Sequence, residues 1–199
     1  DPNGDYSGSS YVVFGKASGF DAAINLSGLD GSNGFRLDGE NGLSGSSVSN
    51  AGDVNGDGFD DVIVGAPFAG FNKVFPPGSS YVVFGKASGF SATIDLSSLD
   101  GSNGFRLDGV SGSLGSSVSN AGDVNGDGYD DLIVGAHDAY PNGPSSGSSY
   151  VVFGKASGFG ATLELSSLDG NNGFRLDGTL DSLTGWSGSS AGDVNGDGF

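Results

Sequence analysis

The stretch Ala51–Ala66, AGDVNGDGFDDVIVGA, decides how the rest of the chain is interpreted. It recurs as AGDVNGDGYDDLIVGA at Ala121–Ala136, and it begins a third time at Ala191 as AGDVNGDGF. Each copy alternates oxygen-bearing side chains with other residues through a glycine-containing loop, and the two complete copies continue into a short apolar run. Such a run bounded by turn residues is typical of a buried strand. The pattern predicts a metal-binding loop that leads directly into a strand.

The rest of the sequence repeats with the same period. SSYVVFGKASGF begins at Ser9, Ser79 and Ser148, so that its copies start 70 and 69 residues apart. GFRLDG begins at Gly34, Gly104 and Gly173, with the same two spacings. Self-similarity at a fixed period indicates structurally equivalent units. The sequence therefore predicts about three units of ~70 residues each.

Each unit is predicted to contain four short strands, because runs of β-branched and aromatic residues are separated by Gly, Ser, Asn and Asp. The second strand is a continuous apolar run and should be buried on both faces, whereas the fourth alternates in polarity and should be more exposed. Between the third and fourth strands, a segment such as Ala92–Gly104 could form a short strand or a single helical turn. The predicted ranges are 46–50 and 116–120 for the first strand, 61–65 and 131–135 for the second, 10–14, 80–84 and 149–153 for the third, and 35–38, 105–108 and 174–177 for the fourth.

Tandem four-stranded units predict an all-β fold of β-propeller-type blades, with a β-sandwich or β-solenoid as the alternative. In this register the chain divides into a partial blade at 1–42, full blades at 43–112 and 113–182, and the start of a further blade at 183–199. The chain then starts after a second strand and stops before the next one. Three units are too few to close a ring, so we expect a partial or open propeller. The chain would then be a segment of a longer protein, or several chains would assemble side by side through open strand edges.

The repeated loop has the donor spacing of a calcium site. Calcium prefers six to eight oxygen ligands, which alternate positions of a tight loop can supply, whereas zinc and copper favour nitrogen and sulfur, and magnesium keeps more waters. An EF-hand needs an acidic residue at position 12, but Val64 and Val134 occupy that position. The alternative without metal is a plain Asx-rich turn. The predicted Ca²⁺ ligands are Asp53, Asn55, Asp57, the Phe59 carbonyl and Asp61; Asp123, Asn125, Asp127, the Tyr129 carbonyl and Asp131; and Asp193, Asn195, Asp197 and the Phe199 carbonyl.

The third loop lacks a ninth position, so we expect its site to be weak or empty.

Composition narrows the classes of partner. The formal net charge is −17, and ten of the 24 acidic residues lie in the three loops, which favours a bound cation over acidity that serves solubility alone. There is no basic patch and no apolar run of membrane-spanning length, so neither nucleic acid nor membrane insertion is expected. The absence of cysteine favours a bacterial secreted protein. The single histidine, His137, has no catalytic partner motif, and we expect no enzyme activity.

The loops between second and third strands differ most between units. PFAGFNKVFPPG at Pro67–Gly78 corresponds to HDAYPNGPSSG at His137–Gly147. In a four-stranded blade these loops share one rim with the loops between fourth and first strands, opposite the predicted calcium loops. Neutral drift in surface loops is the simpler explanation, and a protein or glycan ligand bound at this rim is the alternative. The candidate contact residues are Phe68, Phe71, Phe75, Tyr140 and Trp186.

Leu114–Ala136, together with Gly65-Ala66-Pro67, resembles the FG-GAP repeat of integrin α-subunit β-propellers and their bacterial relatives. The GAP triplet is literal at Gly65, and the FG doublet is replaced by Ser44-Gly45, Leu114-Gly115 and Thr184-Gly185. The SSYVVFGKASGF and GFRLDG modules are similar to those of large secreted bacterial, notably cyanobacterial, repeat proteins. The resemblance implies an extracellular propeller with Ca²⁺ in the loops and a structural or adhesive role. Two alternatives are a self-assembling filament or ring subunit and the non-catalytic propeller portion of a secreted hydrolase or lyase.

Overall fold

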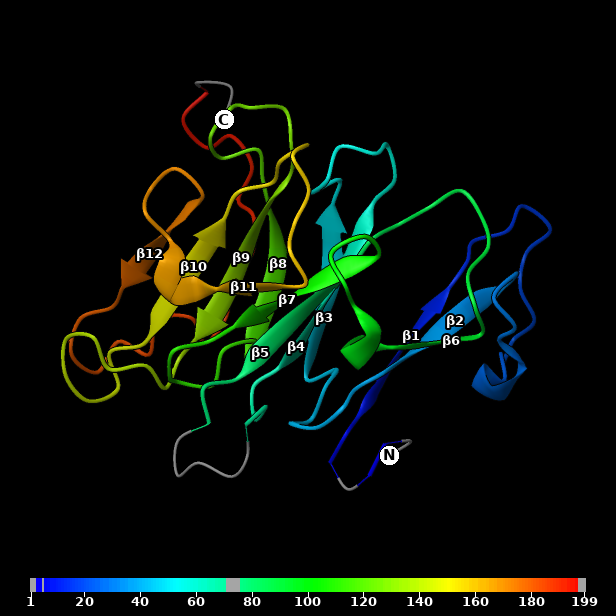
Figure 1. Cartoon of the computed structure of the whole chain (residues 1–199), viewed down its shortest axis with the longest axis horizontal. Coiled ribbons are helices and arrows are strands. Elements are labelled where there is room, and N and C mark those ends of the chain that lie inside the picture. Colours follow the sequence, from blue (N-terminus) through cyan, green and yellow to red (C-terminus); the bar gives the residue numbers. More distant parts are fainter. Residues whose placement is uncertain (1–2, 5, 71–75, 197–199) are drawn as a thin grey trace.

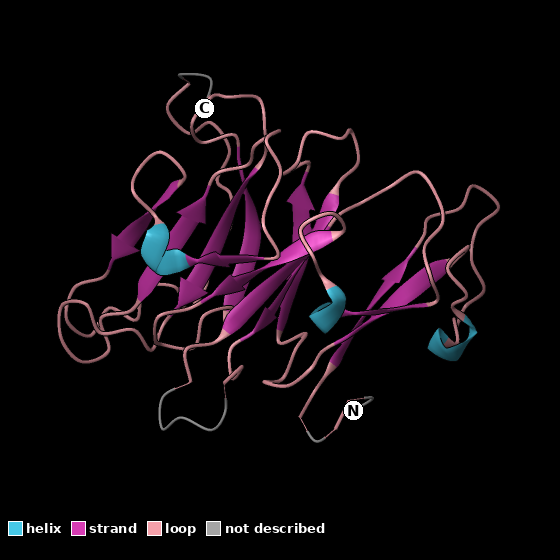
Figure 2. Cartoon of the chain, viewed as in Figure 1, coloured by secondary structure: helices cyan, strands magenta, loops and turns pink. Residues whose placement is uncertain are grey.

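A computed structural model describes residues 3–4, 6–70 and 76–196. It contains three sheets that lie side by side (Figure 1) and are connected by long loops (Figure 2). The sheets have the strand orders β1-β2-β6, β11-β7-β5-β4-β3 and β12-β10-β9-β8. The strands are β1 Ser9–Val13, β2 Gly34–Asp38, β3 Ser47–Gly52, β4 Asp61–Ala66, β5 Ser79–Val83, β6 Thr93–Asp95, β7 Gly104–Asp108, β8 Ser117–Gly122, β9 Asp131–Ala136, β10 Ser148–Val152, β11 Thr162–Glu164 and β12 Gly173–Asp177.

The second and third units each form the predicted four-stranded antiparallel blade. In the second unit β3 pairs with β4, β4 with β5 and β5 with β7, and β8, β9, β10 and β12 follow the same order in the third. The first strands of the two blades, β3 and β8, lie next to each other in the middle of the array (Figure 1). The first unit contributes its third and fourth strands, β1 and β2. The chain is therefore an open array of propeller-type blades.

The segment between the third and fourth strands takes both of the forms that the sequence left open. In the second unit it forms β6 and then a single 3-10 turn, η2, at Leu96–Ser98. In the third unit β11 is followed by η3, at Leu165–Ser167. The corresponding 3-10 turn of the first unit, η1 at Leu26–Gly28, has no strand before it. No helix in the described ranges is long enough to cross a membrane.

The two short strands belong to the sheet of the preceding unit. β6 pairs in parallel with β2, placing Ile94 beside Leu37, and β11 pairs in parallel with β7, placing Leu163 beside Leu107. The second and third units thus each add a strand to the outer edge of the blade before them.

This addition corrects one expectation from the sequence. The fourth strand was predicted to be the more exposed one, but Leu37 on β2 and Leu107 on β7 are fully buried. They are buried because β6 and β11 cover the edges on which they lie. On β12, which is the outermost strand of its sheet, the equivalent Leu176 is 45% exposed. The prediction therefore holds only where the covering strand is missing from the described chain.

Candidate metal loops and the opposite rim

The first complete loop connects β3 to β4 and is held by its own side chains. Asp53 accepts hydrogen bonds from the N–H groups of Asp57 (3.0 Å) and Gly58 (2.9 Å). The Asn55 side-chain oxygen also accepts from the Asp57 N–H (2.9 Å), and an Asp57 carboxylate oxygen accepts from the Phe59 N–H (2.9 Å). These alternate side chains all turn back onto the loop, so that the loop closes around them.

The second loop, between β8 and β9, repeats this arrangement. Asp123 accepts from the N–H groups of Asp127 (3.0 Å) and Gly128 (2.9 Å), and Asn125 accepts from Asp127 (3.0 Å). Asp127 accepts from the Tyr129 N–H at 3.1 Å. The two loops therefore share these hydrogen bonds as well as the spacing of their side chains.

The ninth position of each loop is a buried carboxylate. Asp61 is 1% exposed and accepts from the N–H groups of Val54 (3.1 Å) and Gly85 (2.9 Å). The pKa of Asp61 is raised to about 7, mainly by loss of hydration on burial and to a smaller extent by the nearby charges of Asp57 and Asp53, and the two N–H donors only partly offset this rise.

Asp131 has the same surroundings in the second loop. It is fully buried, it accepts from the N–H groups of Val124 (2.8 Å) and Gly154 (2.9 Å), and burial raises its pKa to about 6. Each loop thus holds a carboxylate whose negative charge is poorly compensated within the chain.

The predicted ligand sets remain predictions. In the ranges that the structure describes, no three acidic or histidine side chains converge closely enough to hold a metal ion between them. The hydrogen bonds within the loops are also those of the plain Asx-rich turn. In the third loop, Asp193 accepts from the Gly196 N–H at 2.6 Å. Asn195 is within the described residues, whereas the other two predicted ligands of that loop, Asp197 and Phe199, lie outside them.

Asp130, one of the ten acidic residues of the three loops, lies at the junction between two units. Its carboxylate accepts a hydrogen bond from the Asp53 N–H of the preceding unit at 2.9 Å, and its own N–H donates to the Asp53 carbonyl at 3.3 Å. The Lys155 N–H donates to the Val54 carbonyl at 2.9 Å. The first loop therefore contacts the next unit as well as its own. The sequence offered one sign of this role. Each complete repeat has two adjacent aspartates, here Asp130 and Asp131, and only the second of them was assigned as a Ca²⁺ ligand.

The GAP triplet also lies at the junction between units. A Cβ added to Gly65 would lie 2.0 Å from the carbonyl oxygen of Gly115 in the next unit, and one added to Gly135 would lie 2.0 Å from that of Gly185. Ser47 donates a hydrogen bond to the same Gly115 carbonyl at 2.7 Å. Only glycine fits here, because a neighbouring backbone occupies the space of a side chain.

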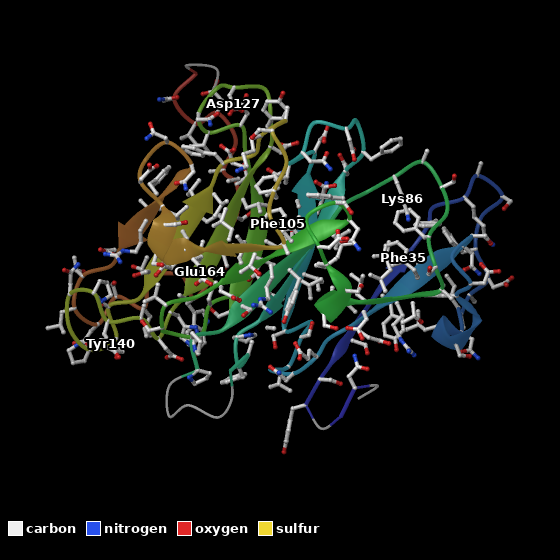
Figure 3. The ribbon with its side chains drawn as sticks, in the orientation of Figure 1. Phe35, Lys86, Phe105, Asp127, Tyr140 and Glu164 are labelled. Carbon is white, nitrogen blue, oxygen red and sulfur yellow. The ribbon has the colours of Figure 1, made fainter. Side chains whose placement is uncertain are left out.

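The variable loops lie on the rim opposite the candidate metal loops. Figure 3 shows Asp127 and Tyr140 at opposite ends of the strands. The Leu114 N–H, between fourth and first strands, donates to the Pro77 carbonyl at 2.9 Å, so the two kinds of loop share this rim as predicted.

Of the candidate contact residues on this rim, Phe68 is 37%, Tyr140 56% and Trp186 64% exposed. The Trp186 ring meets the His137 ring edge-on at 4.5 Å, and His137 lies 3.4 Å from the Asp138 carboxylate. Phe71 and Phe75 lie outside the described residues.

Comparison with known proteins identifies the repeated unit. The family model for the FG-GAP repeat matches residues 44–83 and 114–152. The chain is 41% identical to integrin alpha pat-2 of Caenorhabditis elegans over 95 residues, which are 48% of this chain and 7% of that protein. It is 37% identical to integrin alpha-V of Gallus gallus over 110 residues, which are 53% of this chain and 10% of that protein. The matches thus span at most a tenth of these relatives. The chain thus contains FG-GAP repeats at residues 44–83 and 114–152 and is similar over about half of its length to integrin α subunits.

Proposed function

We propose that this chain is a non-catalytic, extracellular structural or adhesive module whose blades are stabilised by Ca²⁺ bound in the loops between first and second strands. The observation that carries the proposal is the pair of buried carboxylates, Asp61 and Asp131. A cation in each loop would offset the cost of burying a negative charge beside other carboxylates.

The donor chemistry fits calcium. Every side chain in the predicted sets offers oxygen, with no nitrogen or sulfur ligand, which is the preference of a hard cation. Asp53, Asn55, Asp57, Asp61 and the Phe59 carbonyl would hold the first ion, and their equivalents from Asp123 to Asp131 the second. Bound calcium would supply positive charge between the carboxylates and thereby tighten the loop.

The first loop also contacts the next unit through Asp130 and Lys155. Calcium bound there would therefore stabilise the junction between blades as well as the loop itself.

Titration with calcium tests this proposal. We expect calorimetry of the EDTA-treated chain to show a higher melting temperature in excess Ca²⁺, and isothermal titration to report two sites per chain. The variant carrying Asp53→Asn and Asp57→Asn should lose one site. Asp100→Asn is the matched control, because Asp100 also accepts a hydrogen bond in an exposed turn, from the Ser102 N–H, but lies outside the loops. An unchanged melting temperature in excess calcium would refute the proposal.

An adhesive role places ligand recognition on the opposite rim. Tyr140 and Trp186 are large, exposed aromatic side chains on a constant framework, and aromatic residues of this kind are enriched at recognition surfaces. We expect binding to a panel of immobilised glycans and matrix proteins, weakened by Tyr140→Ser or Trp186→Ser and unaffected by Asp100→Asn. Binding that survives both aromatic substitutions would exclude this rim.

The similarity to integrin α subunits supports a location outside the cell and a role without catalysis. The lack of cysteine in all 199 residues supports a bacterial source.

A further inference from the structure

The two complete loops contact each other directly. They lie at the same end of the sheets, between β3 and β4 and between β8 and β9 (Figure 1). The Tyr129 ring of the second loop packs against Gly56 of the first loop, where an added Cβ would overlap the ring. The two units that carry these loops each have all four of their strands, so this is a contact that the array makes between neighbouring blades.

One peptide group connects the predicted ligands of the two loops. Its carbonyl oxygen, that of Tyr129, is a predicted ligand of the second loop, and its N–H, that of Asp130, donates to the Asp53 carbonyl of the first loop at 3.3 Å. The Asp130 carboxylate accepts a hydrogen bond from the Asp53 N–H at 2.9 Å. Both backbone polar groups of Asp53 are thus bound to the second loop. The Asp53 carboxylate closes the first loop by accepting from Asp57 and Gly58, so its position depends on the second loop.

A second connection runs through the segment that follows β10. The Gly154 N–H donates to the Asp131 carboxylate, the ninth position of the second loop, at 2.9 Å. The next N–H along the chain, that of Lys155, donates to the Val54 carbonyl of the first loop at 2.9 Å. The Val54 N–H donates to the Asp61 carboxylate, the ninth position of the first loop, at 3.1 Å. A continuous series of hydrogen bonds and peptide groups thus joins the two buried carboxylates, and such a series can carry coupling between sites.

The connection between the loops is closely packed. Val54 is fully buried. A Cβ added to Gly154 would lie 2.4 Å from the Asp130 carbonyl oxygen and 2.9 Å from that of Val54, and a Cβ added to Gly52 would overlap the Asp130 carboxylate. Because so little free space remains, a displacement of one loop moves the backbone of the other.

We propose that the two loops bind Ca²⁺ cooperatively, so that occupation of either loop raises the affinity of the other. This inference rests on the proposed function, because it takes calcium as the ion. The peptide group between Tyr129 and Asp130, once it is ordered by binding in the second loop, holds Asp53 where the first loop needs it. The shared backbone is therefore ordered only once, at the first binding event, and the second event costs less conformational entropy. The coupling is reciprocal, since each loop must raise the affinity of the other by the same factor.

Isothermal titration of the whole metal-free chain with calcium chloride measures this coupling. Asp53→Asn with Asp57→Asn disables the first loop, and Asp123→Asn with Asp127→Asn disables the second. Each of these two variants gives the association constant of the loop that remains. The product of the two constants of the unaltered chain should exceed the product of the two single-loop constants about fivefold or more, and we call this quotient the coupling ratio.

A stronger test removes the connection and keeps every predicted ligand. Asp130→Ala deletes the carboxylate that accepts from the Asp53 N–H, but Tyr129 keeps its carbonyl oxygen. In this background the coupling ratio should fall close to one. Asp60→Ala is the matched control, because Asp60 has the equivalent position in the first loop and its described hydrogen bond comes from Asn50 in its own unit. This control should leave the ratio unchanged, and circular dichroism confirms that each variant is folded.

Amide hydrogen exchange in EDTA tests the connection without metal. The N–H groups of Asp57 and Gly58 should exchange faster in Asp130→Ala than in the unaltered chain, and at the original rate in Asp60→Ala. The inference is overturned if the coupling ratio of the unaltered chain is close to one, if the ratio survives Asp130→Ala, or if that substitution leaves exchange unchanged. Calcium would still bind in these three cases, so the proposed function would stand. A chain that binds no calcium in either loop would overturn both proposals.

Discussion

The phenylalanine of the SSYVVFGKASGF module provides a test of how neighbouring units stabilise each other. Phe20 and Phe159 have the same local sequence, but Phe20 is 52% exposed and Phe159 is 9% exposed. Phe159 stacks on Phe105 in the preceding unit with an interplanar angle of 3°. Replacing each phenylalanine by alanine therefore compares one side chain inside and outside the contact between units.

We expect Phe159→Ala to cost about 3–4 kcal/mol in the free energy of unfolding. A buried phenylalanine removes on the order of 150–250 Å² from water, worth about 25 cal/mol per Å² as an upper estimate, and the stacked pair adds about 1 kcal/mol. Measured Phe→Ala changes in protein cores lie at about 3–5 kcal/mol. Phe20→Ala should cost about 1 kcal/mol or less, because half of the side chain is already in water.

Urea unfolding, followed by circular dichroism, measures the free energy of unfolding of both variants. In a chain of this length the loss in Phe159→Ala corresponds to a fall in melting temperature of roughly 6–15 °C. Because the contact joins two units of a repeat array, its loss should also broaden the transition or split it in two. Equal costs for the two substitutions would refute the conclusion that Phe159 stabilises the junction between units.

Three further predictions concern glycine, aspartate and pH. Gly154→Ala should lower the free energy of unfolding by about 1–3 kcal/mol, because the added Cβ would lie 2.4 Å from the Asp130 carbonyl oxygen. The equivalent substitution Gly15→Ala should change the melting temperature little, because a Cβ there meets nothing within 4 Å. Asp130→Ala should lower the free energy of unfolding by about 1–2 kcal/mol, because it leaves the Asp53 N–H without its acceptor in the next unit. Asp60→Ala is the control, because the described hydrogen bond to the Asp60 carboxylate comes from its own unit. Equal destabilisation by the two substitutions would contradict the role of Asp130. Burial raises the pKa of Asp61 to about 7 from an unfolded value near 3.8, so the folded chain binds more protons in this window. In EDTA the melting temperature should accordingly fall as pH rises from about 4 to about 7, a trend that calcium should suppress, and a rise over this range in EDTA would contradict it.

The sequence predicts the elements that a unit makes by itself. The spans of β4 and β9 follow from their apolar runs, and the loops before them follow from the alternation of aspartate, asparagine and glycine. The four strands of each unit were predicted from the repeat, and their blade-like arrangement mainly from the resemblance to FG-GAP repeats; both are confirmed, and the structure adds that neighbouring strands of a blade are antiparallel. These features depend on local pattern, which one sequence displays directly.

Features that depend on a neighbouring unit were harder to predict. Three-residue strands such as β6 are too short to show a period, and they form here because β2 lies alongside. The equivalent residues 23–25 have similar composition but remain outside any strand. The burial of Leu37 and the role of Asp130 depend on the next unit in the same way. Tertiary context rather than propensity decides all three.

The contacts between units have a direction. The outer edge of β2 is completed by Phe90 of the following unit, the loop at Asp53 by Asp130, and the space beside Gly65 by the Gly115 carbonyl. In every case the later unit supplies the group that completes the earlier one. An FG-GAP unit of this chain is therefore incomplete alone, and its stability is a sum of its own strands and a junction with its successor. Since the candidate calcium loop lies at that same junction, calcium would act mainly on the coupling between units. The candidate cation site and the stacked phenylalanines lie at different places in the contact between units. Together they would then determine whether neighbouring units unfold cooperatively.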